Sequence, residues 1–146
     1  MQPLEGIRIA DFSHIMAGPY ATHLLRLLGA EVIKIEAPGR GDAMRNYGTD
    51  RAYDGMAPAF IAVNAGKKSV SLDLKNPASL EAARRLIARS DVVVENFRPG
   101  VMARLGLGFP QVRSLKEDIV YCSISGYGQN GPSRDEAAME DRKSVV

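Results

Sequence analysis

Residues 6–36 read as a strand, a helix and a second strand, and this order constrains the fold more than any other part of the chain. Two short β-prone runs, at 6–12 and 32–36, flank a helical pattern that Pro19 opens and Gly29 closes. Proline suits the first turn of a helix, and glycine readily adopts the left-handed conformation that follows one. A strand, a crossover helix and a parallel strand form a right-handed βαβ unit, so these residues predict the start of a parallel sheet.

The helix between the two strands has an apolar stripe with the period of an α-helix. We therefore expect one of its faces to pack on the sheet and the opposite face to meet solvent. Ligands of such sheets usually bind beyond the carboxyl ends of the strands, which for the first strand means residues 13–19. The expected inward face consists of Ala21, Leu24, Leu25 and Leu28, and the outward face of Thr22, His23 and Arg26.

Strand and helix patterns continue to alternate along the rest of the chain. Residues 68–74 alternate like a half-buried strand, and Asn76 and Pro77 are the residue types of a helix N-cap and first helical position. The alternation predicts an α/β fold, a Rossmann-like and mostly parallel sheet with helices on both faces. The other expected elements are a helix over 76–89, a buried strand over 92–94, a short helix ending at Gly106, another from Pro110 with Val112 and Leu115 inward, and a buried strand over 119–124.

Residues 37–60 interrupt this alternation with a stretch rich in glycine, proline and charge that has no sustained period. Loops of this length inside compact domains are usually functional or partly disordered. The stretch is not a linker, because residues 60–63 lead directly into further structure.

The composition is that of a soluble globular protein of one domain, with 146 residues of which 45% are hydrophobic and 25% charged. A formal net charge of +2 without basic blocks argues against nucleic acid as a partner. No run is long enough to span a membrane and no signal peptide begins the chain, so we expect a cytoplasmic location. The single cysteine, Cys122, lies in an apolar run and is expected to be a buried structural thiol.

Four stretches form an ordered set: DFSHIMAGPYATHLLRLLGAEVIKIEAPGRGD, NAGKKSVSLDLK, DVVVENFRPGVMARLGLG and IVYCSISGYGQNGP. In this order they resemble the N-terminal part of the family III CoA-transferases of the CaiB/BaiF type, which share a superfamily with the α-methylacyl-CoA racemases. Enzymes of this family are longer than this chain. The resemblance therefore implies that residues 1–140 are the N-terminal part of a CoA-binding α/β domain, in truncated form.

The resemblance also implies a coenzyme A site at the carboxyl edge of the sheet. Such a site needs cations for the phosphates, backbone amides, and an apolar channel for the pantetheine arm. Met16 and Ala17 would line the inner end of that channel. The nucleotide and its phosphates would be held by Leu72, Asp73, Leu74, Lys75, Asn96, Phe97, Arg98 and Arg104, and the thioester would be approached by Gly126, Tyr127, Gly128 and Gln129, whose glycines permit close backbone contact.

The family moves CoA from an acyl-CoA donor to a free carboxylate, and this resemblance sets the expected activity. An aspartate attacks the donor thioester, which gives a mixed anhydride and releases CoA thiolate. The thiolate then attacks the aspartyl carbonyl, the donor acid leaves, and the sequence reverses with the acceptor acid. The exchange is thereby divided into steps with activated acyl groups. The glycine-loop amides would stabilise the oxyanions. The reaction needs no metal ion and no separate cofactor, and the full-length enzymes are interlocked homodimers.

The family pattern puts the catalytic aspartate near position 140, where this sequence has Glu140. Met139 stands in place of the aromatic residue that should precede it. Residues 141–146 back-translate to a common sequencing-library adapter, so we predict that they are a non-native tail and that the codon at 140 originally began GA. The 146-residue polypeptide is accordingly expected to be inactive or poorly soluble alone.

Other interpretations stay open on the sequence. A racemase of the same superfamily would use these motifs to move an α-proton. A dinucleotide-binding module would hold a ribose with Glu36, although the first loop lacks GxGxxG and Pro19 removes an amide. An inert fragment is a third alternative. Each candidate residue, taken singly, also has an ordinary structural explanation. Lys75, Arg98 and Arg104 could be solvated surface cations, and His14 could be a packed or solvated imidazole. Met16 could fill the core, and Gly126 and Gly128 could form a turn.

Overall fold

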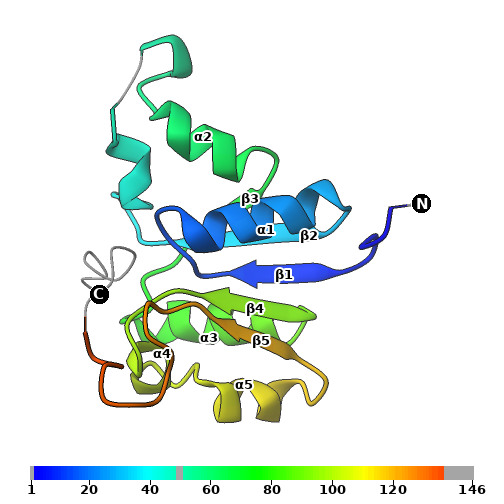
Figure 1. Cartoon of the computed structure of the whole chain (residues 1–146). Helices are drawn as coiled ribbons and strands as arrows, with labels where there is room; N and C mark the ends of the chain where they lie inside the picture. The colour runs from blue at the N-terminus through cyan, green and yellow to red at the C-terminus, as the bar shows by residue number, and fades with distance from the viewer. Residues whose placement is uncertain (1, 49–50, 137–146) are drawn as a thin grey trace.

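The computed structural model describes residues 2–48 and 51–136, and its five strands form one parallel sheet (Figure 1). The strand order is β3-β2-β1-β4-β5, so the chain moves outward first to one side of β1 and then to the other. The switch point therefore lies between β1 and β4. The strands are β1 (Arg8–Asp11), β2 (Glu31–Glu36), β3 (Lys68–Ser71), β4 (Val92–Glu95) and β5 (Val120–Ser123).

Helices cover both faces of the sheet, as the sequence predicts (Figure 1). Ala10 and Val93 face the larger core, which includes Ala83 and Ile87 of α3. Ile9 faces the opposite side, in a smaller cluster that Leu25 of α1 joins. The helices are α1 (Ala17–Leu27), α2 (Pro58–Asn64), α3 (Pro77–Ile87), α4 (Val101–Arg104) and α5 (Phe109–Leu115), with short 3-10 turns η1 (Ala43–Asn46) and η2 (Arg51–Tyr53).

The predicted start of α3 is confirmed. Asn76 is the N-cap, and its side chain accepts hydrogen bonds from the backbone N–H groups of Ala78 and Ser79. Pro77 occupies the first helical position, where its missing N–H costs nothing. Within the two described ranges, no helix has the combination of length and apolar character that a bilayer crossing requires.

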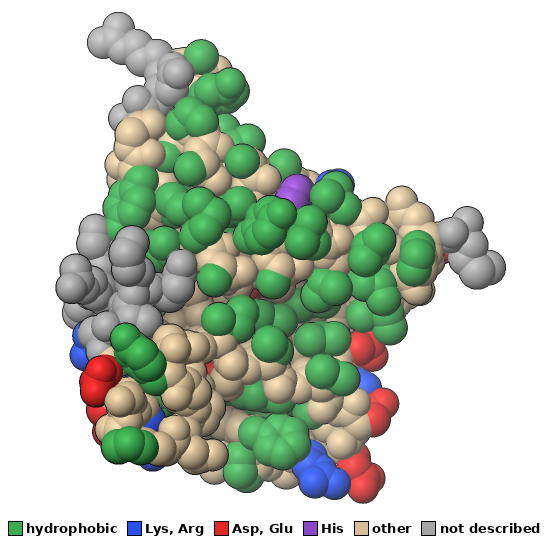
Figure 2. Space-filling view, viewed as in Figure 1, with side chains coloured by type: hydrophobic (Ala, Val, Ile, Leu, Met, Phe, Trp, Pro, Cys, Tyr) green, Lys and Arg blue, Asp and Glu red, His purple; other side chains and the backbone are tan. Residues whose placement is uncertain are grey.

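The predicted inward face of α1 is wrong at two positions. Leu24 and Leu28 are 43% and 47% exposed, whereas Thr22, predicted to face solvent, is fully buried. Thr22 turns inward because its hydroxyl donates a hydrogen bond to the carboxylate of Asp11, 2.6 Å away. The helix is thus positioned by a polar contact at the end of β1, and apolar side chains gather on its visible outer side (Figure 2).

The last strand also departs from expectation, because β5 is an edge strand and not a buried one. Val120 is 60% exposed, and Cys122, expected to be buried, is exposed. Val112 points inward as predicted, but Leu115 is 41% exposed. An edge strand is paired on one side only, so an apolar run does not by itself guarantee burial.

Candidate functional site

A cavity of about 600 Å³ opens at the carboxyl edge of the sheet, beside the switch point. Loops that follow four different strands contribute to its wall, which is the arrangement expected for the ligand site of an open α/β sheet. Its lining consists of Phe12, His14 and Ile15 after β1, Ile35 and Glu36 at the end of β2, Ala37, Pro38, Arg40, Gly41, Ala43, Asn46 and Tyr47 after β2, Leu72 to Lys75 after β3, and Asn96 and Phe97 after β4.

Six of the residues predicted to bind coenzyme A come together in this wall. They are Leu72, Asp73, Leu74, Lys75, Asn96 and Phe97, from two loops separated by more than 20 residues of sequence. The strand order explains their meeting, because parallel strands bring all their carboxyl ends to one edge.

The eight other predicted site residues in the part of the chain that the structure describes do not contribute to the cavity wall. Met16 precedes α1 and is 38% exposed, and Ala17 begins that helix. Arg98 and Arg104 are exposed beyond β4. Gly126, Tyr127 and Gly128 are exposed and Gln129 is half-buried, in the loop beyond β5. The predicted catalytic position, Glu140, lies outside the described residues, as do residues 141–146.

Residues 37–47, to which the sequence assigned no role, form the outer wall of the cavity. One of their two cations, Arg40, lines the cavity, as does the aromatic ring of Tyr47. Aperiodic segments give no indication of which side chains point inward. The length of this segment and its glycine and proline content were the only available signal.

This outer wall is held to the sheet by Glu36, the last residue of β2. Arg45 donates two hydrogen bonds to the Glu36 carboxylate, at 2.9 and 2.7 Å, and Ser69 of β3 donates a third at 2.6 Å. The guanidinium of Arg45 also lies 4.0 Å from the ring centroid of Phe60 in α2. The segment is therefore fixed at both ends, although it contains little regular structure.

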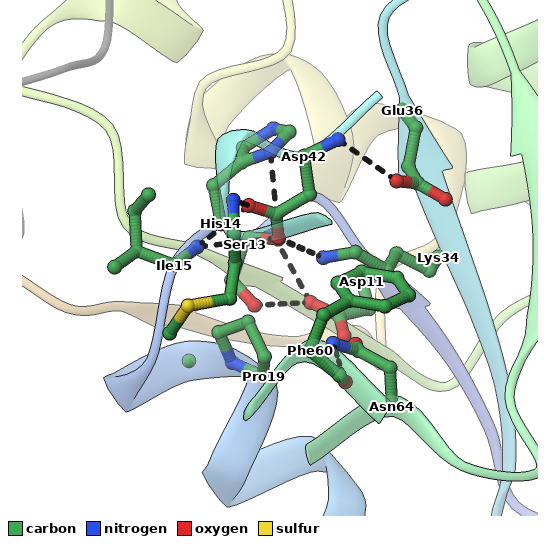
Figure 3. A network of polar contacts seen from close by, with 12 residues as sticks. Asp11, Ser13, His14, Ile15, Pro19, Lys34, Glu36, Asp42, Phe60 and Asn64 are labelled. Atoms are coloured by element: carbon green, nitrogen blue, oxygen red, sulfur yellow. Dashed lines mark hydrogen bonds and ion pairs between the residues drawn. The ribbon is translucent and has the colours of Figure 1, made fainter. Parts of the chain in front are cut away.

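Asp42 anchors the same segment to the loop after β1 (Figure 3). Its side chain is fully buried and lies 2.9 Å from the ammonium of Lys34, which is itself 2% exposed. The carboxylate also accepts the backbone N–H groups of Ile15, at 3.1 Å, and Met44, at 3.0 Å. Ile15 has φ +67°, a strained conformation for a β-branched residue, and Asp42 holds its N–H in place.

The Asn96 side chain crosses the switch point and ties β4 to the loop after β1. Its carbonyl accepts the backbone N–H of His14 at 2.8 Å, and its amide donates to the His14 carbonyl at 2.8 Å. Asn96 is 3% exposed, so its polar atoms serve the architecture of the cavity. This role was invisible in the sequence, because the two residues are 82 positions apart.

A second buried ion pair lies beneath α1. The ammonium of Lys67 lies 3.1 Å from the carboxylate of Asp11, and neither side chain is more than 2% exposed. Burial would raise the pKa of Asp11, but the charges of Lys34 and Lys67 and hydrogen bonds from two hydroxyls outweigh it and lower the pKa. Lys67 also donates to the Pro19 carbonyl, the Thr22 hydroxyl and the Asn64 side chain.

The stability of the chain is expected to fall as the pH is lowered from about 4.5 to about 2. Burial raises the pKa of Glu36, but hydrogen bonds from Arg45, Ser69 and the Asp42 N–H outweigh it and lower the pKa from 4.5 to about 2. A folded-state pKa below the unfolded value means that this stabilisation is complete above pH 4.5 and disappears toward pH 2. Its size is on the order of 2 kcal/mol, allowing for solvent screening of the partly exposed Arg45.

Urea unfolding at a series of pH values measures this effect. Glu36→Gln should flatten the acid limb of the stability curve, whereas Glu81→Gln, on the exposed side of α3, should leave it unchanged. An acid limb of equal slope in both variants would show that Glu36 does not carry it.

The cavity combines an apolar interior with cations at its outer part. Phe12, Ile35 and Phe97 provide buried apolar surface, and Lys75 and Arg40 add positive charge on exposed loops. A ligand that suits this arrangement has an elongated, largely uncharged part and an anionic part.

The sequence matches the model of CoA-transferase family III over residues 4–142. It is 43% identical over 151 residues to a succinyl-CoA:glutarate CoA-transferase of Mus musculus, covering 100% of this chain and 33% of that protein. It is 40% identical over 138 residues to a succinyl-CoA–D-citramalate CoA-transferase of Chloroflexus aurantiacus, covering 94% and 34%.

The fold has a similarly close counterpart among solved structures. The crystal structure of a CaiB/BaiF family protein from Brucella suis superposes with a TM-score of 0.88 at 37% identity, covering 93% of this chain and 36% of that one. The chain thus spans about a third of the length of the curated relatives it matches.

Proposed function

The chain belongs to CoA-transferase family III, and from this premise we propose that its cavity at the sheet edge binds the coenzyme A portion of an acyl-CoA. The observation that carries the proposal is the convergence of residues 72–75 and 96–97 on one wall. The family resemblance implies a coenzyme A contact for both loops, independently of their position in space.

Coenzyme A matches the chemistry of this cavity better than a nicotinamide dinucleotide does. Its pantetheine arm is long and uncharged, as the apolar interior requires, and its phosphates suit Lys75 and Arg40. A dinucleotide site would need Glu36 to hold a ribose. That carboxylate is instead occupied by Arg45 and Ser69.

For the whole protein we propose transfer of CoA between carboxylates through an aspartyl intermediate. The two relatives described above carry names with succinyl-CoA as donor and a dicarboxylic acid as acceptor. Succinyl-CoA with glutarate is therefore the first substrate pair to assay. A racemase would act on the thioester without any acceptor acid, so dependence of turnover on glutarate separates the two activities. Assembly of the whole protein as a homodimer stays a prediction from the family resemblance.

Calorimetric titration of the chain with coenzyme A tests the binding proposal. Lys75→Met is expected to weaken binding by about tenfold, because a charge-assisted contact to phosphate contributes roughly 1.5 kcal/mol. The deficit should shrink at high salt, where phosphate charge is screened.

Lys68→Met is the matched control. Lys68 lies at the start of β3, outside the cavity lining, and pairs with Glu31. Its replacement should leave the affinity within about twofold. Equal losses in the two variants, or no binding by an unaltered chain that is soluble and folded by circular dichroism, would refute the assignment of phosphate contacts to Lys75.

A further inference from the structure

His14 is placed in the cavity wall by contacts that fix both its backbone and its ring. Its backbone N–H and carbonyl are both hydrogen-bonded to the side chain of Asn96. Its ring packs at a tilt against Phe97, with 5.5 Å between ring centroids. The side chain is 27% exposed, and it lines the cavity. The hydrogen bonds to Asn96 fix the backbone of His14, and the contact with Phe97 distinguishes its ring from a fully solvated imidazole.

The two ring nitrogens of His14 lie in different surroundings (Figure 3). Nδ1 is turned toward the buried carboxylate of Asp42, at 3.9 Å. That distance is too long for a hydrogen bond, but the negative charge favours the tautomer that carries its proton on Nδ1. Nε2 is then an acceptor, on a ring that belongs to the cavity lining.

The charged groups around His14 act in opposite directions on its protonation. Burial and the ammonium of Lys34 lower the pKa of His14, and the carboxylates of Asp42, Asp11 and Glu36 raise it. The net effect lowers the pKa from its ordinary value of 6.5. The ring is therefore uncharged near neutral pH.

We propose that His14 is a specificity-determining residue of the cavity, whose Nε2 accepts a hydrogen bond from an N–H or O–H group of the bound ligand. The inference rests on the proposed coenzyme A function and adds an orientation to it. In coenzyme A, the amides and hydroxyl of pantetheine, the amino group of adenine and the ribose 2′-hydroxyl can donate this bond, and the ionised phosphates cannot.

The apolar ring of Phe97 beside His14 favours the pantetheine arm as the donor, with the arm at the switch point and the phosphates toward Lys75 after β3. Lys75 follows β3, which lies two strands from β1, and that separation is roughly 10 Å at a strand spacing of about 4.8 Å. The distance leaves room for the arm to lie across the end of β2. In this proposal the end of the cavity at His14 selects groups that donate a hydrogen bond, and the end at Lys75 carries positive charge.

Two fragments of coenzyme A test the two ends of the cavity independently. They are pantetheine and adenosine 3′,5′-bisphosphate. In calorimetric titrations, His14→Phe should weaken pantetheine binding about five- to tenfold, as expected for one lost hydrogen bond, and leave the bisphosphate unaffected. His14→Gln retains an acceptor oxygen, so it should keep pantetheine affinity within about threefold. Circular dichroism of each variant establishes that it is folded.

The pH dependence provides a readout that a purely structural role would not affect. Protonation converts Nε2 from an acceptor into a donor, so pantetheine binding by the unaltered chain should weaken as the pH falls below 6.5. Binding by His14→Gln should not change over the same range. His23→Gln, which alters the other histidine of the chain, should retain the pH dependence.

The outcomes distinguish this inference from the function on which it rests. Equal weakening of both fragments by His14→Phe, no weakening of either, or the same pH profile of pantetheine affinity in the unaltered chain and in His14→Gln, followed down to the lowest pH at which both stay folded, would overturn the role of His14 and leave the coenzyme A site standing. Failure of the unaltered chain to bind either fragment would overturn the coenzyme A site, and the role of His14 with it.

Discussion

Replacing Asp42 by alanine is expected to lower the free energy of unfolding by about 3–5 kcal/mol, because it leaves the ammonium of Lys34 buried without its counterion. The backbone N–H groups of Ile15 and Met44 would lose their acceptor as well. Domains of this size have only about 5–15 kcal/mol of stability in total, so the variant should be close to unfolding at 25 °C. Urea unfolding followed by circular dichroism measures the loss.

Two comparisons show whether the cause is the buried pair. Glu81→Ala removes an exposed ion pair with Arg85 on α3 and should cost no more than about 0.5 kcal/mol. The double variant Lys34→Met/Asp42→Asn removes both charges and keeps an acceptor oxygen, so it should be clearly more stable than Asp42→Ala. A loss below about 1 kcal/mol for Asp42→Ala would contradict the structural role of this pair.

Replacing Asn96 by alanine is expected to lower the free energy of unfolding by about 2–3 kcal/mol and coenzyme A affinity by about tenfold. The substitution removes the hydrogen-bond partners of the backbone N–H and carbonyl of His14. A buried polar group without a partner lowers the free energy of unfolding by roughly 1–3 kcal/mol. The loop after β1 would then no longer be fixed across the switch point. Denaturant unfolding and calorimetric titration measure the two effects.

Asn46→Ala is the matched control, since it makes the same chemical change in a residue of the same cavity wall. Asn46 is exposed at the end of η1, so its loss should change stability by no more than about 0.5 kcal/mol. If Asn96→Ala were as stable as Asn46→Ala, the hydrogen bonds from Asn96 to the His14 backbone would not be what fixes the loop after β1.

The features that were predictable from sequence depend on neighbours in the chain. The period of the apolar residues and the cap at Asn76 are local, and the right-handed crossover rule then leaves few topologies. The meeting of residues 72–75 with Asn96 followed from these rules, because carboxyl ends of parallel strands share an edge.

The features that sequence reasoning missed depend on contacts between distant residues. Lys34 lies within an apolar strand, and only the position of Asp42 explains why its charge is buried. Thr22 is buried because Asp11 accepts its hydrogen bond, a contact that turns α1 away from the orientation predicted by its leucines. The outer wall of the cavity is held by Arg45, and no periodic pattern marks that residue.

The cavity as a coenzyme A site is tested most directly by titrating the ¹⁵N-labelled chain with coenzyme A and mapping the amide signals that move. The largest changes are expected at residues 12–15, 36–47, 72–75 and 96–97, which include the cavity wall. Changes centred instead on the shallow surface around Phe109 and Arg113, or no changes in a folded chain at millimolar coenzyme A, would contradict it.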